Sequence, residues 1–182
     1  MALVEYSIDP AHSSINFSVR HMVIAKVRGK FSEYSGQIRI DEEDFTRSSA
    51  ELRVRTASID TGVEDRDKHL RSADFFDSEK HPEMRFVSRS ITKTGDRRYK
   101  MSGELTIRDV TKTIELEVRD EGRGKDPWGN ERAGYTVHGS LDRGDYGLRW
   151  NQALEAGGVL VGEKVDIDLE LSMIRQGKTA AA

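Results

Sequence analysis

The chain has no cysteine among its 182 residues. This absence excludes a disulfide framework, a thiol nucleophile and any metal site that depends on thiolate ligands. A metal ion would have to be held by histidine and carboxylate side chains. The length suits a single domain, because 182 residues leave no room for two well-formed cores.

The sequence also lacks an excess of charge and any long apolar run. Its 29 basic and 32 acidic residues give a formal net charge of -3, so we expect no general attraction to nucleic acid or to an anionic membrane surface. No apolar stretch approaches the ~20 residues of a membrane-spanning helix, which predicts no stable membrane insertion. The first residues, Met1 to Tyr6, include an acid and lack the basic and apolar regions of an export signal. We therefore expect a cytoplasmic protein.

Apolar residues recur at every second position along most of the chain. The clearest run extends from Glu163 to Met173, where Val165, Ile167 and Leu169 alternate with charged residues. This is the period of a strand with one buried and one solvated face. The chain therefore predicts an all-β fold that consists mainly of antiparallel sheet.

Three local patterns refine this prediction. The parity of the apolar positions switches between Phe31 and Tyr34, which indicates a bend in the second strand. Arg108-Asp109 separates two alternating runs and is typical of a tight hairpin turn, whereas residues 126–130 form a longer connection; both favour an up-and-down meander. Residues 63–73 lack alternation and have helical spacing, so one short helix is expected there, with Asp60-Thr61 as its cap.

A sheet with one apolar face must bury that face, and we expect it to do so by closing into an extended barrel of about eight strands. Such a barrel either is filled by side chains or holds one slender ligand, and periodicity leaves both alternatives open. We expect residues 1–176 to form this domain and residues 177–182 to be a mobile tail.

Several motifs, spread from Ile8 to about Met173, resemble those of the YceI family. They are Asp9-Pro10-Ala11-His12-Ser13, Phe17-Ser18-Val19-Arg20-His21, Val27-Arg28-Gly29-Lys30-Phe31, Ser58-Ile59-Asp60-Thr61, the stretch Arg66 to Asp77, Pro82-Glu83-Met84-Arg85-Phe86, the stretch Gly103 to Lys112, and Arg143-Gly144-Asp145-Tyr146-Gly147. The resemblance implies a lipocalin-like barrel, often a homodimer, that binds a polyprenyl chain or a similar amphiphile and has no established catalysis. For a cytoplasmic chain the implied ligand is an isoprenoid quinone or a prenyl-lipid intermediate, and no cofactor is expected.

If the barrel holds such a lipid, inward apolar side chains would contact its tail and a few polar groups at the mouth would contact its head. Arg20 is a further polar candidate at the mouth. The candidate ligand-binding residues are Phe17, Val19, His21, Phe31, Tyr34, Phe86, Met101, Leu105, Val118, Tyr135, Val137, Arg143 and Trp150.

Two alternatives compete with lipid binding. A structural or stress-associated interaction protein would have a filled barrel and use its outer face. A metal-dependent or hydrolytic enzyme would use the five histidines, but His12 and His21 differ by nine positions and point to opposite faces of an unbroken strand. Asp65 and His69 have i, i+4 spacing on the expected helix, yet two ligands are too few for a metal site, and we expect an ordinary exposed carboxylate–imidazole pair there. His21 is either a hydrogen-bonded core residue or a head-group contact.

Two aromatic features have alternative readings as well. Phe75-Phe76 at the end of the helical segment is interpreted either as a lid over the bore or as a hydrophobic plug, and both readings require burial. Trp128 is expected to anchor its loop by packing, whereas Trp150 is expected near the entrance.

Overall fold

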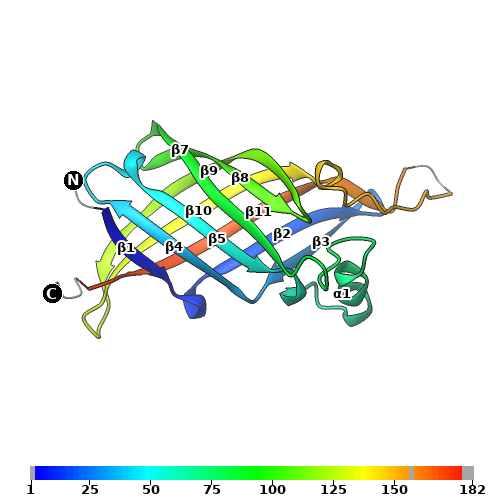
Figure 1. Ribbon diagram of the computed structural model, residues 1–182, viewed down its shortest axis with the longest axis horizontal. Coiled ribbons are helices and arrows are strands. Elements are labelled where there is room, and N and C mark those ends of the chain that lie inside the picture. The colour runs from blue at the N-terminus through cyan, green and yellow to red at the C-terminus, as the bar shows by residue number, and fades with distance from the viewer. Residues whose placement is uncertain (1–2, 156–157, 178–182) are drawn as a thin grey trace.

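The computed structural model describes residues 3–155 and 158–177, and most of these residues lie in strands (Figure 1). Residues 178–182 of the expected mobile tail lie outside the described ranges. The strands are β1 (Leu3–Ile8), β2 (Ser14–His21), β3 (Ala25–Phe31), β4 (Tyr34–Asp41), β5 (Ser49–Arg55), β6 (Ile59–Asp60), β7 (Glu83–Gly95), β8 (Arg98–Ile107), β9 (Val110–Lys125), β10 (Glu131–Asp142) and β11 (Val161–Arg175). The helical elements are α1 (Glu64–Arg71) and the 3₁₀ turns η1 (Pro10–His12), η2 (Phe45–Arg47), η3 (Thr56–Ser58) and η4 (Arg143–Tyr146).

These strands form a closed antiparallel barrel with an up-and-down meander, as expected. Three pairs of short strands each continue along one line of the sheet. β1 and β2 both pair with β11; β4 and β3 lie along the other side of β1 and β2; and β5 and β6 lie along the far side of β4 and β3. With β7 to β11, the described part of the chain makes eight strands, and β11 closes the barrel by pairing with β1 and β2. The bend predicted between Phe31 and Tyr34 is the junction of β3 and β4.

The turn chemistry follows the sequence. Arg108 and Asp109 join β8 to β9 with φ values of 52° and 68°, the left-handed conformation that two-residue hairpins of this type require. The longer connection between β9 and β10 spans residues 126–130, as predicted.

Helix α1 confirms the expected helix but not its cap. The helix begins at Glu64 after Val63, and the side chains of Asp60 and Thr61 do not cap it. Instead, the buried carboxylate of Asp67 accepts hydrogen bonds from the backbone and hydroxyl of Thr61, at 2.9 and 2.5 Å. The cap prediction was wrong because a side chain inside the helix reaches back to this turn.

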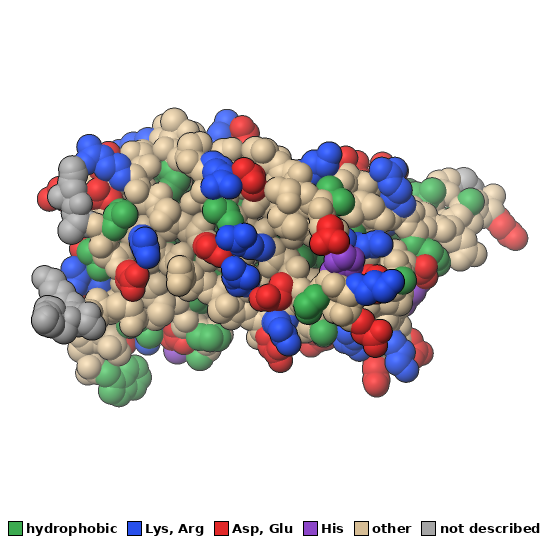
Figure 2. Space-filling view, in the orientation of Figure 1, with side chains coloured by type: hydrophobic (Ala, Val, Ile, Leu, Met, Phe, Trp, Pro, Cys, Tyr) green, Lys and Arg blue, Asp and Glu red, His purple; other side chains and the backbone are tan. Residues whose placement is uncertain are grey.

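On the face shown in Figure 2, charged side chains of both signs are interspersed over the surface. Trp128 is one of several large apolar side chains that are exposed: it is 81% exposed at the tip of the β9–β10 connection, so the prediction that it anchors the loop by packing was wrong. Asp126 holds this loop by accepting hydrogen bonds from the backbone of Trp128 and Asn130. No helix among the residues described is long and apolar enough to cross a membrane.

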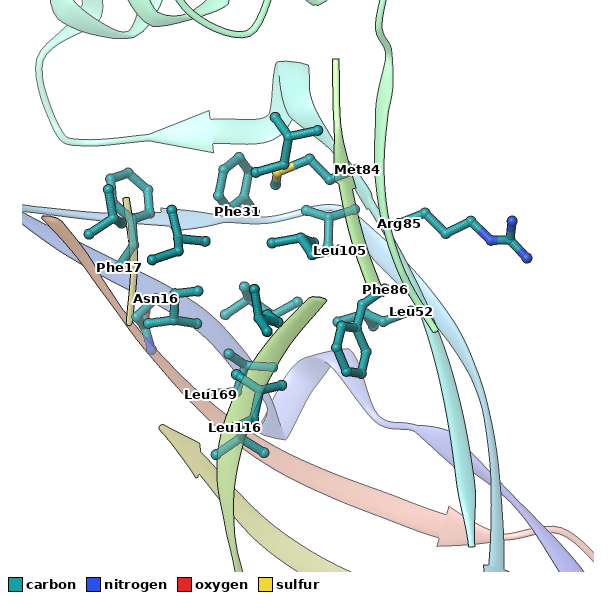
Figure 3. Close-up of a pocket in the computed structure, with 18 of the residues that line it drawn as sticks. Asn16, Phe17, Phe31, Leu52, Met84, Arg85, Phe86, Leu105, Leu116 and Leu169 are labelled. Carbon is teal, nitrogen blue, oxygen red and sulfur yellow. The ribbon is translucent and has the colours of Figure 1, made fainter. Parts of the chain in front are cut away.

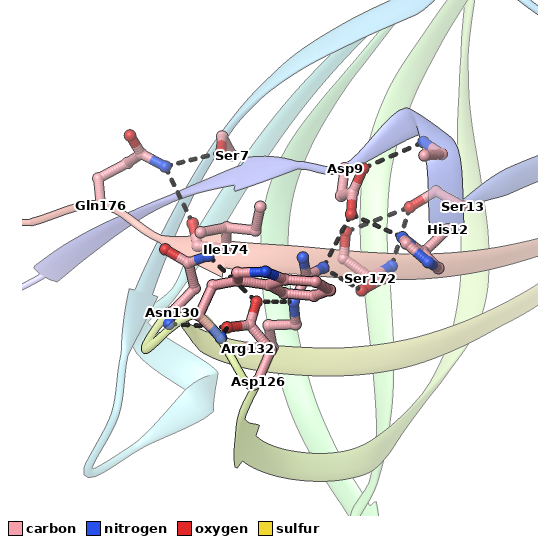
Figure 4. A network of polar contacts seen from close by, with 12 residues as sticks. Ser7, Asp9, His12, Ser13, Asp126, Asn130, Arg132, Ser172, Ile174 and Gln176 are labelled. Atoms are coloured by element: carbon pink, nitrogen blue, oxygen red, sulfur yellow. Dashed lines mark hydrogen bonds and ion pairs between the residues drawn. The ribbon is translucent and has the colours of Figure 1, made fainter.

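Figure 4 shows how this loop is tied to the start of the chain. Arg132 donates to Asp126 at 2.7 Å and to Asp9 at 2.8 Å, and thereby joins β10 to the segment between β1 and β2. The Arg132 guanidinium, followed by His12, lowers the pKa of Asp9 to about 2, and Arg132 also lowers the pKa of Asp126. This network fixes one end of the barrel.

Candidate functional site: an apolar cavity along the barrel

The barrel interior contains a cavity of about 360 Å³ with an almost wholly apolar lining. It extends from Ile40 and Met173 near one end to His21 and Trp150 near the other. The volume falls within the range of small-molecule sites and is more than twice that of an apolar cavity of about 150 Å³ known to bind benzene. The inward side chains therefore line a space rather than fill it completely.

Glycines opposite large side chains help to shape this space. Gly29 faces Phe17 across the β2–β3 pair, and a Cβ at Gly29 would lie 2.4 Å from the Phe17 ring. A Cβ at Gly103 would similarly lie 2.3 Å from the ring of Phe86. Because these glycines have no side chain, the two rings lie close to the barrel wall and do not cross the bore.

Most sequence-predicted site residues lie on the cavity wall. Figure 3 shows Phe17, Phe31, Phe86 and Leu105 gathered around the space. Tyr34 does not line the cavity; it is partly buried against the core. Arg20 is exposed on the outside. Those that line the cavity are Phe17, Val19, His21, Phe31, Phe86, Met101, Leu105, Val118, Tyr135, Val137, Arg143 and Trp150.

Other lining residues were not among the predicted site residues although their parity identifies them. Leu116 lies in phase with Val118, and Leu169 lies in phase with the rest of the β11 run. Leu52 lies in the alternating run of β5. Arg85 reaches the lining through its stem, and Figure 3 shows its guanidinium pointing away from the cavity.

A second cluster of buried residues lies at the end of the barrel where α1 and η4 meet. Phe75, Ile107, Tyr146 and Leu148 are each at most 5% exposed and pack together there. Phe76 is partly buried against them. Phe75 and Phe76 also line the cavity. Their burial was expected from the sequence under both interpretations, and the pair contributes to closing this end.

Arg143 is the buried cation of this end, 6% exposed. Its guanidinium donates to the backbone carbonyl oxygens of Leu148, Trp150, Val161 and Gly162 at 2.6 to 3.2 Å. Burial lowers its pKa, and no carboxylate pairs with it among the described residues. With four hydrogen bonds to carbonyls, Arg143 holds the segment that follows η4 and has little capacity left for a ligand.

Two polar groups at this end have no hydrogen-bond partner among the residues described. The hydroxyl of Tyr146 is buried without a hydrogen bond, and burial raises its pKa to about 12. The ring of His21 lines the cavity and has no polar partner within the described part of the chain. By contrast, His69 pairs with Asp74 at 2.8 Å and packs edge-on against Trp150. The expected pairing of His69 with Asp65 was wrong, because His69 turns toward the loop after the helix.

The histidines are dispersed, each with its own environment. His12 pairs with Asp9, His81 lies 3.6 Å from Asp109, and His138 pairs with Asp168 at 2.8 Å. Asp168 raises the pKa of His138. Across residues 3–155 and 158–177, no three histidine or carboxylate side chains are placed to hold a metal ion.

Solved structures share this architecture. A YceI protein of Campylobacter jejuni superimposes with a TM-score of 0.73 at 28% identity, over 86% of this chain and 90% of that one. BcnA of Burkholderia cenocepacia has a TM-score of 0.80 at 22% identity, over 91% and 98% of the two chains. A polyisoprenoid binding domain from Saccharophagus degradans has a TM-score of 0.68 at 15% identity, over 95% and 99%. The last two likenesses concern the fold alone.

Sequence comparison leads to the same family. A UPF0312 protein of Staphylococcus epidermidis is 36% identical over 167 residues, which are 91% of this chain and 95% of the relative. A UPF0312 protein of Staphylococcus aureus is 34% identical over the same shares. The model of the YceI-like domain matches residues 6–173. The chain therefore belongs to the YceI family.

Proposed function

We propose that this protein binds one long isoprenoid or similar amphiphilic lipid inside the barrel, for storage, transport or sequestration. The observation that carries the proposal is the apolar cavity of about 360 Å³ along the barrel interior. Each buried ligand methylene contributes about 0.8 kcal/mol, so a chain-like ligand gains affinity from area alone. A domain with this fold that is named for polyisoprenoid binding supports the same class of ligand.

The ligand head group belongs, in this proposal, at the end of the cavity near η4. The unpartnered hydroxyl of Tyr146 and the ring of His21 offer hydrogen bonds there. A head group that bonds to Tyr146 would satisfy a buried polar atom that otherwise lacks a partner. A hydroxyl or carbonyl head, as in a prenyl alcohol or quinone, matches these donors and acceptors.

We propose binding without catalysis. Among the residues that the structure describes, the polar groups of the cavity do not form a nucleophile with an adjacent base: His69 is held by Asp74, and Arg143 is held by backbone carbonyls. The cavity also argues against a barrel filled by its own side chains. A cytoplasmic location and a homodimer remain proposals that come from the sequence and the family resemblance.

Solvent extraction of freshly purified protein, followed by mass spectrometry of the extract, tests the proposal without assuming the ligand's identity. Native mass spectrometry of the intact protein gives the stoichiometry and the oligomeric state. One prenyl lipid or long-chain amphiphile per chain is expected. A protein that carries no lipid and takes up no added geranylgeraniol would contradict lipid binding.

Uptake can be followed with the protein's own fluorescence. The chain has two tryptophans, of which Trp150 lines the cavity and Trp128 is exposed at the other end of the barrel. In a Trp128→Phe variant only Trp150 reports. Titration with geranylgeraniol should change its emission in a saturable manner, whereas glycerol, which shares only the hydroxyl chemistry, should not.

A further inference from the structure

The turn between β2 and β3 is unusual in the exposure of its side chains and in its backbone conformation. Met22, Val23 and Ile24 are 51%, 52% and 87% exposed, although all three are apolar. Met22 and Val23 also have φ values of 54° and 70°, a left-handed conformation that is unfavourable for a β-branched residue and usually occupied by asparagine or glycine. Apolar residues at these positions improve neither the stability of the turn nor the solubility of the protein. Their presence therefore points to a role in which these side chains contact a binding partner.

The strands that carry this turn have a local charge opposite to that of the whole chain. From Ser14 to Phe31 there are four lysines and arginines and no acid, while the other residues have 25 basic and 32 acidic side chains, a difference of -7. Arg20 lies directly opposite Lys26 in the sheet register, and Arg28 and Lys30 follow on the same outward face. These four side chains have no ion-pair partner within the described ranges.

The turn lies at the η4 end of the cavity. The backbone N–H of Met22 donates to the carbonyl of Leu160 at 2.7 Å, and both Leu160 and the adjacent His21 line the cavity. Val159, 43% exposed, follows Gly158, which lies against Val23. We call Met22, Val23, Ile24 and Val159 the apolar tip.

The hairpin is also loosely tied to the barrel on one side. β3 pairs with β6 only at Lys30 and Phe31, so residues 25–29 belong to an edge that pairs only with β2. In Figure 1 this hairpin ends beside the loop that leads into β11, away from the two termini. The apolar tip is therefore carried by a strand that pairs on one side only over residues 25–29.

We infer that the apolar tip docks on a membrane surface that contains anionic lipids. Met22, Val23 and Ile24 would enter the interfacial layer, and Arg20 and Lys26 would lie at the level of the phosphates. This orientation places the η4 end of the cavity against the bilayer, so that a lipid ligand passes between membrane and barrel with little exposure to water. The inference goes beyond lipid binding in the cavity, because it concerns a separate surface.

A second copy of the chain fits this surface less well. A twofold contact would place the same patch on both sides and so set the row of cations against itself. A stable dimer also buries about 800 Å² per partner, more than the four side chains of the apolar tip offer. Exposed acids also lie at this end, among them Asp142, Asp145, Glu155 and Glu163, so the cations alone cannot hold the membrane contact and the apolar side chains are needed as well.

Co-sedimentation of the full chain with vesicles of phosphatidylcholine, with and without phosphatidylserine, tests the inference. The protein should bind the vesicles that contain phosphatidylserine, and more weakly at high salt. The double variant Met22→Asn, Val23→Gly removes apolar surface and suits the positive φ values, so it should fold at least as well and lose binding more than tenfold. The double variant Arg20→Gln, Lys26→Gln should lose about thirtyfold on these vesicles.

Trp128→Ser is the matched control, because it removes an exposed apolar side chain at the opposite end and should leave sedimentation unchanged. Failure of the wild-type protein to bind, equal binding by the Met22→Asn, Val23→Gly variant, or loss of binding in Trp128→Ser would each overturn the inference. So would a dimer in analytical ultracentrifugation that the tip variant dissolves. Uptake of geranylgeraniol from detergent, read by Trp150 in a Trp128→Phe background, should persist in the tip variant, so failure of docking is distinguishable from failure of lipid binding.

Discussion

Replacing Val137 with tryptophan distinguishes an open bore from a filled core. Val137 lies on β10, lines the cavity and is 8% exposed. In the sheet register it lies between Val118 on β9 and Leu169 on β11, which also line the cavity. A tryptophan side chain has about seven more heavy atoms than valine, and here they would project into the interior.

The two states of the interior predict different magnitudes. In a filled core the larger ring causes strain of about 1–3 kcal/mol. In a cavity of about 360 Å³ the ring has room, so we expect the free energy of unfolding of the lipid-free protein to fall by less than about 1 kcal/mol. Ligand affinity should fall much further. If the ring displaces about seven ligand carbons at about 0.8 kcal/mol each, the loss is on the order of 5 kcal/mol, a factor of several thousand.

The assay compares urea unfolding of delipidated Val137→Trp and wild-type protein, followed by titration of each with geranylgeraniol and detection by native mass spectrometry. Ser140→Trp, at an exposed position on the outer face of the same strand, is the control and should retain uptake. A strongly destabilised Val137→Trp variant that binds geranylgeraniol as well as the wild type would refute the reasoning.

Three further predictions test the parts of the structure around the cavity. Gly29→Ala should turn the Phe17 ring into the bore and reduce uptake more than stability, whereas Gly103→Ala, whose Cβ would also lie 2.6 Å from a backbone carbonyl oxygen, should lower the free energy of unfolding by about 1–3 kcal/mol in urea titration. Arg143→Met should destabilise by about 2–4 kcal/mol in the same titration, because four backbone carbonyls lose the hydrogen bond from Arg143, although that of Val161 keeps a second donor, Asn151; Arg143→Lys should restore only part of the loss. Arg132 lowers the pKa of both Asp9 and Asp126, so these two carboxylates should stabilise the folded protein fully above about pH 4 and cease to do so as the pH falls toward 2. Arg132→Gln should therefore make the melting temperature less dependent on pH in that window.

The strand pattern could be predicted from sequence because alternation depends only on which face of a strand is solvated. The run from Glu163 to Met173 became β11, and Arg108-Asp109 became a hairpin turn. The predictions that failed concern choices between neighbouring polar or aromatic partners. His69 selected Asp74 instead of Asp65, and Trp128 remained exposed because its loop is held by hydrogen bonds from Asp126. Which partner a side chain takes depends on the tertiary structure, and the periodicity of the sequence gives no information about it.

The same limit applies to the candidate site. Alternation places Val118, Tyr135 and Val137 on the inward face whether the interior is filled or open, because both states need apolar side chains there. The difference arises from which residues face each other across neighbouring strands. Phe17 lies opposite Gly29, so its ring rests over the space that a side chain would occupy and leaves the centre of the barrel free. Lipid binding in this fold therefore depends on the sheet register as much as on composition, and a test of the bore should alter the glycine as well as the ring.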